Sequence, residues 1–310
     1  MRYKFEEKEK INIKESDEGL VLVHDSFNPT HIFECGQCFN FYIEEDGSYT
    51  AVHLGKIINI LEREDDILIR NISLDEFYDI FYDYFDLGTD YRKIKAKLSE
   101  NEILKTATDY GYGIRILNQE LFENVISFII SANNGISRIK KSIRIISERY
   151  GEYIGKYMGR EYYSFPRPEV LAKVDPLELR EYARVGFRDV RIVEASKMVS
   201  DGFLDFKEDQ KLETRQLKEK LMQMPGIGPK VADCVLLFTY HRRETFPVDV
   251  WIKRVMETLF IGHDVPKKQV DNYARDYFGD LAGYAQQYLF YYGREEKIGK
   301  WGCCRMNKPS

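Results

Sequence analysis

Short runs of apolar residues, separated by polar and glycine-containing turns, dominate the first hundred residues of the chain. Runs of this length and spacing are typical of strands in an antiparallel sheet. Leu54-Gly55 separates two of the runs and predicts a tight hairpin between them. Ser73 and Glu76 form a capping box, which predicts that a helix begins there. The expected strands cover residues 20–23, 38–42, 49–53, 56–61 and 67–70.

From about residue 105 onward, the apolar positions follow the period of an α-helix. Leu121, Val125 and Phe128 share one face of the first such segment, together with Ile129. A second apolar stripe contains Ile136, Ile139, Ile143 and Ile146, and four cations lie off it: Arg138, Lys140, Lys141 and Arg144. Further helices are expected from Asp175-Pro176 and over residues 217–224, 230–240 and 249–260.

These patterns predict an α+β fold. An N-terminal antiparallel β-sheet domain over residues 1–104 precedes a mainly α-helical body over residues 105–310. Charge divides along the same line: residues 1–100 carry 12 Lys+Arg and 22 Asp+Glu, whereas residues 101–310 carry 34 and 29. The balances are −10 and +5, so a polyanionic partner is expected on the second part.

The chain contains five cysteines, which is an odd number. At 310 residues the chain is also large for a scaffold held together by disulfides. It shows no signal peptide and no long apolar span, which predicts a cytoplasmic protein without a membrane partner. Cys35 and Cys38 form a C-x-x-C pattern and raise the alternative of a zinc or redox protein. Cys303 and Cys304 are adjacent and poorly suited to complete a zinc site, so no metal is predicted.

The segment Met224-Pro-Gly-Ile-Gly-Pro-Lys230 interrupts two helices with a glycine-rich turn. Gly226 and Gly228 permit positive φ and close approach of the backbone to another molecule. Their N–H groups lie beside a helix N-terminus, which predicts binding of an anion such as a DNA phosphate. The alternative is a plain turn between two helices. Whether the turn also holds a monovalent cation is left open.

Lys230 and Asp249 are the candidate catalytic pair. Lys230 lies at the start of the second helix, where the helix dipole favours the neutral amine that a nucleophile requires. Asp249 follows the extended segment Phe246-Pro247-Val248 at a helix N-cap position. A carboxylate held there could stabilise positive charge on a sugar ring, although simple capping is the alternative.

The sequence resembles the helix-hairpin-helix DNA glycosylases, and within them the 8-oxoguanine DNA glycosylases. The missing four-cysteine cluster separates it from the iron–sulfur branch, and Lys230 separates it from members that hydrolyse with water alone. The resemblance covers most of the chain, through Phe33–Phe39, Phe128–Asn134, Val185–Arg188, Pro225–Cys234, Pro247–Val250 and Tyr284–Phe290.

The resemblance implies a bifunctional glycosylase and lyase that needs no cofactor and acts as a monomer on double-stranded DNA with 8-oxoguanine opposite cytosine. Lys230 would attack C1′, and Asp249 would support the transition state. Gly36 would accept a hydrogen bond from N7–H of the oxidised base. The other base-recognition residues would be Cys234, Pro247, Gln286 and Phe290.

The resemblance also implies how the duplex would be opened. Asn133 would fill the gap left by the flipped base, Arg138 and Arg188 would contact the orphaned cytosine, and Phe187 would wedge into the stack. Phe187 stands where a tyrosine is usual, and Trp251 stands where animal enzymes carry a histidine associated with a DNA phosphate. Singly, each of these residues has an ordinary structural role as its alternative. An alkylated-base glycosylase of the same superfamily and a non-catalytic DNA clamp are the competing functions.

Overall fold

The computed structural model describes residues 11–299. Six antiparallel strands form one sheet in the order β1-β2-β6-β5-β4-β3. Their bounds are β1 Asn12–Ser16, β2 Gly19–Val23, β3 Phe41–Ile43, β4 Tyr49–His53, β5 Lys56–Glu62 and β6 Ile67–Arg70. The predicted N-terminal antiparallel sheet and the hairpin at Leu54-Gly55 are confirmed. The predicted strand over 38–42 begins too early, since residues 38–40 lie in the loop before β3.

Short helices flank the sheet and lead into the body. Asn28 caps the first helix through a hydrogen bond from the His31 N–H. Ser73 and Glu76 form the predicted capping box at α2. The helices of this part are α1 Pro29–Glu34, α2 Leu74–Glu76, a π-helical turn Phe77–Phe81, α3 Tyr82–Tyr84, α4 Tyr91–Leu98 and α5 Glu102–Tyr110.

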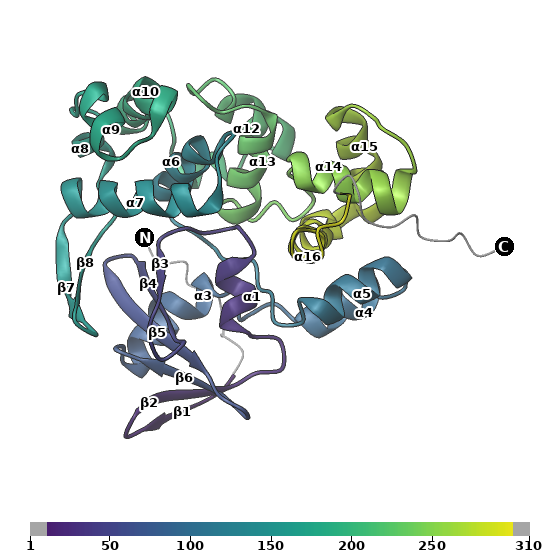
Figure 1. Cartoon of the computed structure of the whole chain (residues 1–310), viewed down its shortest axis with the longest axis horizontal. Coiled ribbons are helices and arrows are strands. Elements are labelled where there is room, and N and C mark those ends of the chain that lie inside the picture. Colours follow the sequence, from purple (N-terminus) through teal and green to yellow (C-terminus); the bar gives the residue numbers. More distant parts are fainter. Residues whose placement is uncertain (1–10, 300–310) are drawn as a thin grey trace.

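The rest of the chain is mainly helical, as predicted, and Figure 1 shows these helices gathered above and beside the sheet. A two-stranded hairpin, β7 Tyr153–Tyr157 and β8 Arg160–Tyr163, interrupts the series and was not predicted. The helices are α6 Leu121–Ser131, α7 Ile136–Tyr150, α8 Pro168–Leu171, α9 Pro176–Tyr182, α10 Asp189–Ser200, α11 Phe206–Asp209, α12 Thr214–Leu221, α13 Pro229–Phe238, α14 Val250–Met256, α15 Lys267–Phe278 and α16 Ala282–Glu295.

The two parts share a buried junction. Arg115 is fully buried, and its guanidinium donates to the carbonyls of Phe85 at 2.7 Å and Ser26 at 3.2 Å. The core of the helical body also includes Tyr91 and Leu104, from α4 and α5. The predicted boundary at 104/105 therefore falls inside α5, which packs against α16. The boundary itself stays a prediction.

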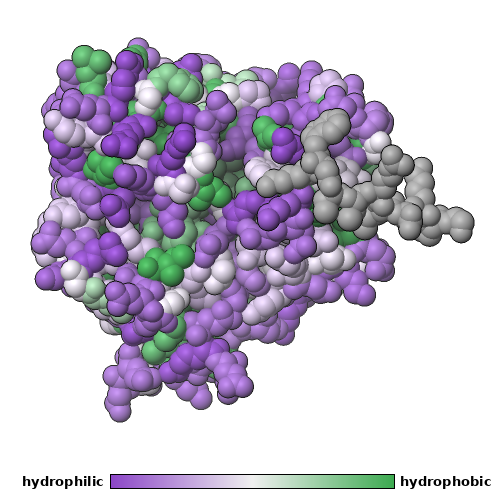
Figure 2. Space-filling model, viewed as in Figure 1, coloured by the Kyte–Doolittle hydropathy of each residue, from purple (hydrophilic) through white to green (hydrophobic). Residues whose placement is uncertain are grey.

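The surface gives few apolar clues to a partner. Figure 2 shows a mostly hydrophilic face on which hydrophobic residues are scattered in small groups. Such scatter is ordinary for a folded protein. Across residues 11–299, no helix combines the length and apolar character needed to span a bilayer. Concave regions and charge therefore locate the candidate sites better than apolar patches do.

Four histidines are held neutral by the fold. Burial lowers the pKa of His53 from 6.5 to about 3, and burial is also the largest cause that lowers the pKa of His24, His31 and His241 to about 4. His53 is 8% exposed and stacks on Tyr84 with ring centroids 4.1 Å apart. At these four positions the unfolded chain therefore binds more protons than the folded chain below pH 6.5.

We expect the contribution of these histidines to the free energy of unfolding to fall as the pH drops from about 6.5 towards 4, whereas the raised pKa of the buried Glu123 and Asp233 acts in the opposite direction. The sign follows because each lowered pKa favours unfolding once the unfolded histidine becomes protonated. His53→Phe should keep a ring against Tyr84 but reduce this slope by up to about 1.4 kcal/mol per pH unit. Urea denaturation of both proteins across this range measures the slopes. Equal slopes would show that His53 does not contribute.

Candidate active site

A cleft of about 970 Å³ opens where the α6–α7 loop, the α12–α13 hairpin and the starts of α14 and α15 meet. Six of the predicted residues line it together. They are Asn133, Arg138, Gly226, Gly228, Lys230 and Asp249. Residues separated by more than 100 positions in the sequence thus share one concave surface, which is the expected character of a binding site.

The hairpin between α12 and α13 forms one wall of the cleft. The helix predicted over 217–224 ends earlier, at Leu221, and the turn closes with a hydrogen bond from the Ile227 N–H to the Met224 carbonyl at 3.1 Å. Gly226 has φ +86°, as the prediction of positive φ requires. Gly228 instead has φ −95° and ψ −179°, an extended conformation open to any residue, and forms the N-cap of α13. Gly228 is exposed and has open space where a Cβ would lie, so an anion could approach its backbone closely.

The two hairpin glycines should respond differently to alanine. Gly226→Ala should lower the free energy of unfolding by roughly 1–3 kcal/mol because of its positive φ. A Cβ there would also lie 3.1 Å from Ile129 Cγ2. Gly228→Ala should leave stability nearly unchanged, since no atom lies within 4 Å of its Cβ, yet weaken DNA binding by holding a phosphate away. Chemical denaturation and DNA titration measure the two effects. Unchanged DNA affinity in Gly228→Ala would place the phosphate elsewhere.

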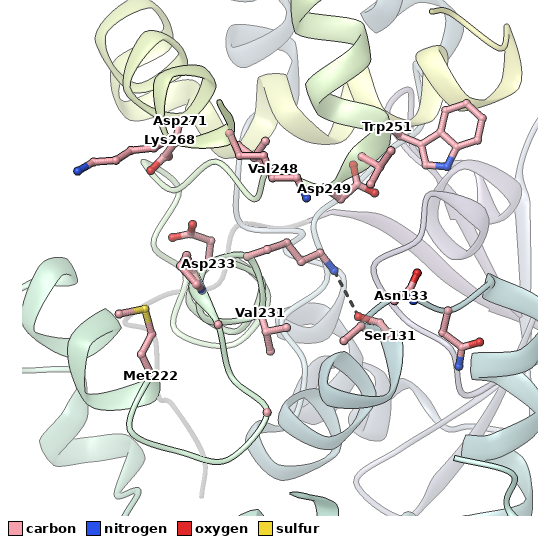
Figure 3. Close-up of a pocket in the computed structure, with 18 of the residues that line it drawn as sticks. Ser131, Asn133, Met222, Val231, Asp233, Val248, Asp249, Trp251, Lys268 and Asp271 are labelled. Atoms are coloured by element: carbon pink, nitrogen blue, oxygen red, sulfur yellow. Dashed lines mark hydrogen bonds between the residues drawn. The ribbon is translucent and has the colours of Figure 1, made fainter. Parts of the chain in front are cut away.

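Lys230 is the second residue of α13 and is half-buried. Its Nζ donates to Ser131 Oγ at 3.3 Å, drawn as the dashed line in Figure 3, and lies 4.8 Å from the centroid of the Phe128 ring. Ser131 ends α6 and was not singled out in the sequence. A hydroxyl and an aromatic ring thus direct the amine across the cleft, and no acidic side chain among residues 11–299 forms an ion pair with it.

Asp249 is the N-cap of α14, as predicted. One carboxylate oxygen, Oδ1, accepts a hydrogen bond from the Ile252 N–H at 2.8 Å. Figure 3 shows the carboxylate facing the cleft across from Ser131. The cap uses one oxygen and fixes the side-chain orientation, which leaves the second oxygen for another partner. The arrangement presents an amine and an oriented carboxylate to one space.

The predicted base-recognition residues do not line this cleft and are mostly buried. Gly36 has φ +79°, and a Cβ there would lie 2.7 Å from Phe290 Cε1, so the backbone at Gly36 rests directly on the Phe290 ring. Gln286 is 5% exposed and donates through Nε2 to the Pro247 carbonyl at 3.3 Å. Its Oε1 is buried without a hydrogen-bond partner in the described chain. A ligand donor could therefore satisfy an acceptor that the protein leaves open.

Gln37 positions the loop that carries Gly36. Its side chain donates to the carbonyls of Ile32 and Arg115, each at 2.8 Å, and accepts from the Leu117 N–H at 2.8 Å. Gln287 of α16 donates to the Cys35 carbonyl at 3.3 Å. These hydrogen bonds attach the loop to both the segment before α6 and the C-terminal helix. The sequence pattern did not reveal Gln37, because a buried glutamine has no periodic signature.

Cysteine chemistry finds little support in these environments. Burial raises the pKa of Cys35 and of Cys234 to about 11, and raises the pKa of Cys38 well above its ordinary value. The thiolate is the reactive and metal-binding form, so such thiols are poor ligands and nucleophiles. No group of three or more His, Cys, Asp or Glu within residues 11–299 could hold a metal. Cys303 and Cys304 lie outside the described residues. Cys234 is 3% exposed and lies on α13, four residues after Lys230.

The residues predicted to contact the opened duplex differ in their exposure to solvent. Asn133 is exposed with φ +51°, Arg138 is exposed on α7, and Phe187 is 56% exposed. Arg188 is instead 6% exposed, and its guanidinium donates to the carbonyls of Ala132 at 3.0 Å, Asn133 at 3.1 Å and Val185 at 2.9 Å. To reach a cytosine, Arg188 would have to exchange these carbonyl acceptors for the base.

Other polar residues line the cleft that the sequence did not single out. Asp233 is buried, and burial raises its pKa to about 6 even though Lys218 Nζ lies 2.7 Å away. Lys267 and Lys268, at the start of α15, are exposed on the opposite wall. Two lysines directly after Pro266 could have been chosen from the sequence as candidate DNA contacts. Only the fold shows that they line the same cleft as the hairpin. Trp251, the departure noted above, also lines the cleft.

Two family models match successive parts of the chain. Residues 20–125 match the family model of the 8-oxoguanine DNA glycosylase N-terminal domain, and residues 126–279 match that of the HhH-GPD superfamily base excision DNA repair proteins. A probable N-glycosylase/DNA lyase of Methanothermobacter thermautotrophicus is 32% identical over 233 residues, covering 69% of this chain and 74% of the relative. The N-glycosylase/DNA lyase OGG1 of Arabidopsis thaliana is 25% identical over 87% of this chain and 78% of its own.

Solved structures show the same relationship. MBOgg1 in complex with a low affinity DNA ligand has a TM-score of 0.88 and 43% identity, covering 93% of this chain and 99% of that one. The Clostridium acetobutylicum 8-oxoguanine glycosylase/lyase, in complex with DNA containing cytosine opposite 8-oxoG, has a TM-score of 0.88 and 39% identity over 92% and 98%. The chain therefore belongs to the 8-oxoguanine DNA glycosylase family of the HhH-GPD superfamily of base excision DNA repair proteins.

Proposed function

We propose that this protein is a bifunctional DNA glycosylase and AP lyase that excises 8-oxoguanine from double-stranded DNA. The observation that carries the proposal is that Lys230 and Asp249 line one cleft together with the hairpin glycines. A nucleophilic amine, an oriented carboxylate and an anion-binding turn are the groups that this reaction requires. Family membership and the N-glycosylase/DNA lyase relatives support the same reaction.

Lys230 would supply the nucleophile. Its amine nitrogen attacks C1′ of the deoxyribose, the C1′–N9 bond breaks, and the base leaves with the bonding electrons and takes up a proton. One amine proton compensates the proton taken up by the base, and the second passes to O4′ as the C1′–O4′ bond breaks and the sugar ring opens, which leaves an imine between Nζ and C1′. The hydrogen bond to Ser131 Oγ holds Nζ near the end of α6 and restricts its rotamers before substrate arrives.

Asp249 would stabilise the positive charge that develops on the sugar as the base departs. A negative charge fixed by the cap hydrogen bond needs no reorganisation during the reaction, which is what makes such groups effective. The imine then acidifies the C2′ proton. Its removal expels the 3′ phosphate by β-elimination and cuts the strand 3′ to the lesion.

Base selection would depend on the residues around the Gly36 loop. The Gly36 carbonyl would accept the N7–H that 8-oxoguanine carries and guanine lacks, so an unmet acceptor disfavours guanine. Gln286 would read the Watson–Crick edge, with Pro247 lining the same pocket. Phe290 and Cys234 would sandwich the flipped base.

The remaining residue roles concern the duplex. Asn133 would occupy the gap, Phe187 would enter the stack, and Arg138 and Arg188 would contact the opposite base, which we propose to be cytosine. Gly226 and Gly228 would bind a phosphate. We further propose that the enzyme acts as a monomer in the cytoplasm, associated with the nucleoid in a bacterium, and that catalysis requires no cofactor. A monovalent cation bound at the hairpin would have a structural role.

Excision assays on matched duplexes test the proposed function. With 8-oxoguanine opposite cytosine we expect base release and strand cleavage, and with 3-methyladenine or undamaged guanine we expect neither. Release of only the alkylated base would favour the other glycosylase specificity. Tight binding to every duplex without base release would favour a non-catalytic DNA clamp.

A further inference from the structure

A second groove, separate from the active-site cleft, runs between residues 39–43, helix α7 and Arg160 at the start of β8. It has a volume of about 390 Å³. Figure 1 shows α7 lying across the top of the sheet, with the β7–β8 hairpin descending beside it. The charged side chains that line the groove are Lys140, Lys141, Arg144 and Arg160. All four are cations, and no lining residue is acidic.

Aromatic rings hold two of these cations in place without neutralising them. Lys140 Nζ lies 3.6 Å from the centroid of the Phe41 ring, and the Arg160 guanidinium carbon lies 4.4 Å from that of Tyr42. Such contacts orient a cation and leave its charge available. Arg160 Nε is also buried without a hydrogen-bond partner among residues 11–299. A buried donor of this kind is satisfied by an acceptor that approaches from the groove.

The two other cations are exposed on α7. Lys141 has no ion-pair partner in the described chain, and Arg144 lies 3.3 Å from Glu148, with both side chains 45% exposed. Exposed ion pairs of this type contribute little to stability. The charges of Lys141 and Arg144 therefore do little to hold the fold together. All four cations come from the second part of the chain, residues 101–310, whose charge balance is +5.

Helix α7 connects this groove to the active-site cleft. Arg138 lines the cleft, and Lys141, three residues later, lines the groove. The rise between them is about 4.5 Å along the helix axis, comparable with the rise of about 3.4 Å per base pair along one DNA strand. A duplex held in the cleft could thus extend along α7 to the groove.

We propose that this groove binds backbone phosphates of the same DNA duplex, outside the lesion site, and carries the DNA-binding surface onto strand β3. The inference rests on the proposed function. Phosphates of a long polyanion satisfy several spaced cations at once, and releasing their counterions favours binding. The groove contacts no reacting atom, so its residues contribute to affinity and leave the chemical step unchanged.

The double variant Lys141→Gln/Arg144→Gln tests the proposal. The matched control is Lys105→Gln/Arg215→Gln, which removes an exposed lysine that has no ion-pair partner among residues 11–299 and an arginine in a comparable i,i+4 pair with Glu219. Neither control residue lines the cleft or the groove. Affinity is measured against salt concentration on a duplex of about 25 base pairs, roughly 85 Å long, that contains an uncleavable abasic-site analogue.

We expect the slope of log affinity against log salt to become shallower by about 2 in the groove variant, since each lost phosphate contact contributes about 0.9. The control variant should keep the wild-type slope. Single-turnover excision at saturating enzyme should be equal in all three proteins. Restoring the charge with Lys141→Arg/Arg144→Lys should restore the slope.

A groove variant whose slope matches that of the control would overturn the proposal, while normal excision by the wild type would leave the proposed function intact. Loss of affinity for inorganic phosphate alone, with an unchanged DNA slope, would assign the groove to a small anion and would also overturn it. Failure of the wild type to excise 8-oxoguanine would instead contradict the proposed function. The excision assay measures this separately from the salt dependence of binding.

Discussion

Lys230→Gln is expected to eliminate the covalent adduct that borohydride traps on a duplex with 8-oxoguanine opposite cytosine. Borohydride reduces an imine between the enzyme and C1′, so an adduct requires the amine that attacks. Glutamine keeps a polar side chain that can still bond to Ser131, but it supplies no nucleophile. We expect excision to fall by roughly 10³-fold or more, the scale on which loss of a nucleophile acts.

Lys268→Gln is the matched control, because Lys268 is another lysine of the same cleft and is exposed on α15. It should retain the adduct and alter only affinity. Thermal denaturation of both variants checks that the fold is kept. Trapping of Lys230→Gln at the wild-type level would assign the nucleophile to a different amine. Absence of an adduct even from the wild type, with the lesion left in place, would contradict the 8-oxoguanine assignment.

Asp249→Asn is expected to reduce excision by roughly 10²- to 10⁴-fold while stability changes by less than about 1 kcal/mol. Asparagine caps a helix about as well as aspartate, so the hydrogen bond from the Ile252 N–H should persist. The negative charge that would stabilise the sugar cation is lost. The substitution therefore separates the capping role of Asp249 from its electrostatic role.

Asp175→Asn provides the corresponding control. Asp175 caps α9 by accepting from the Leu177 N–H at 2.9 Å, and it does not line the cleft. Both substitutions change an N-cap aspartate in the same way, so only the cleft position should affect excision rate. Full activity of Asp249→Asn would mean that Asp249 acts as a cap alone. Rates under single-turnover conditions, with denaturation in parallel, decide between the two.

The sequence was most informative where periodicity or turn chemistry was strong. The hairpin strands β4 and β5, the capping box at α2 and the helices α6 and α7 agree with their predicted positions. The predicted helix over 249–260 is also present, as α14 followed by a π-helical turn through Ile261. In each case the local pattern and the tertiary burial favour the same structure.

Elements defined by tertiary contacts were missed. Strand β1 is almost wholly exposed and polar, and its conformation depends on pairing with β2. The β7–β8 hairpin turns at Met158-Gly159, both with positive φ, but its strands lack alternating burial. Helix α1 has six residues, too few to show a helical period.

The site shows the same division. Lys230 and Asp249 could be selected because the hairpin and the N-cap are local patterns, and the fold places both in one cleft. Ser131 could not be selected, since its contact with Lys230 joins positions 99 residues apart. The hydrogen bonds of Arg188 to the Ala132 and Asn133 carbonyls were equally inaccessible, because an arginine in sequence gives no indication of its acceptors.

The hydrogen bonds between the Gly36 loop and α16 mean that base selection and bond cleavage depend partly on different segments of the chain. The Lys230 amine, the Asp249 carboxylate and the proposed phosphate-binding turn all come from residues after 120. The carbonyl proposed to select the base belongs to Gly36, and hydrogen bonds of Gln37 and Gln287 hold its loop in place. Mutations in the loop could therefore redirect the enzyme towards another damaged base without disturbing bond cleavage. The other proposed base-recognition residues, Cys234, Pro247, Gln286 and Phe290, belong to the second part of the chain, so only the contribution of Gly36 could vary independently in this way.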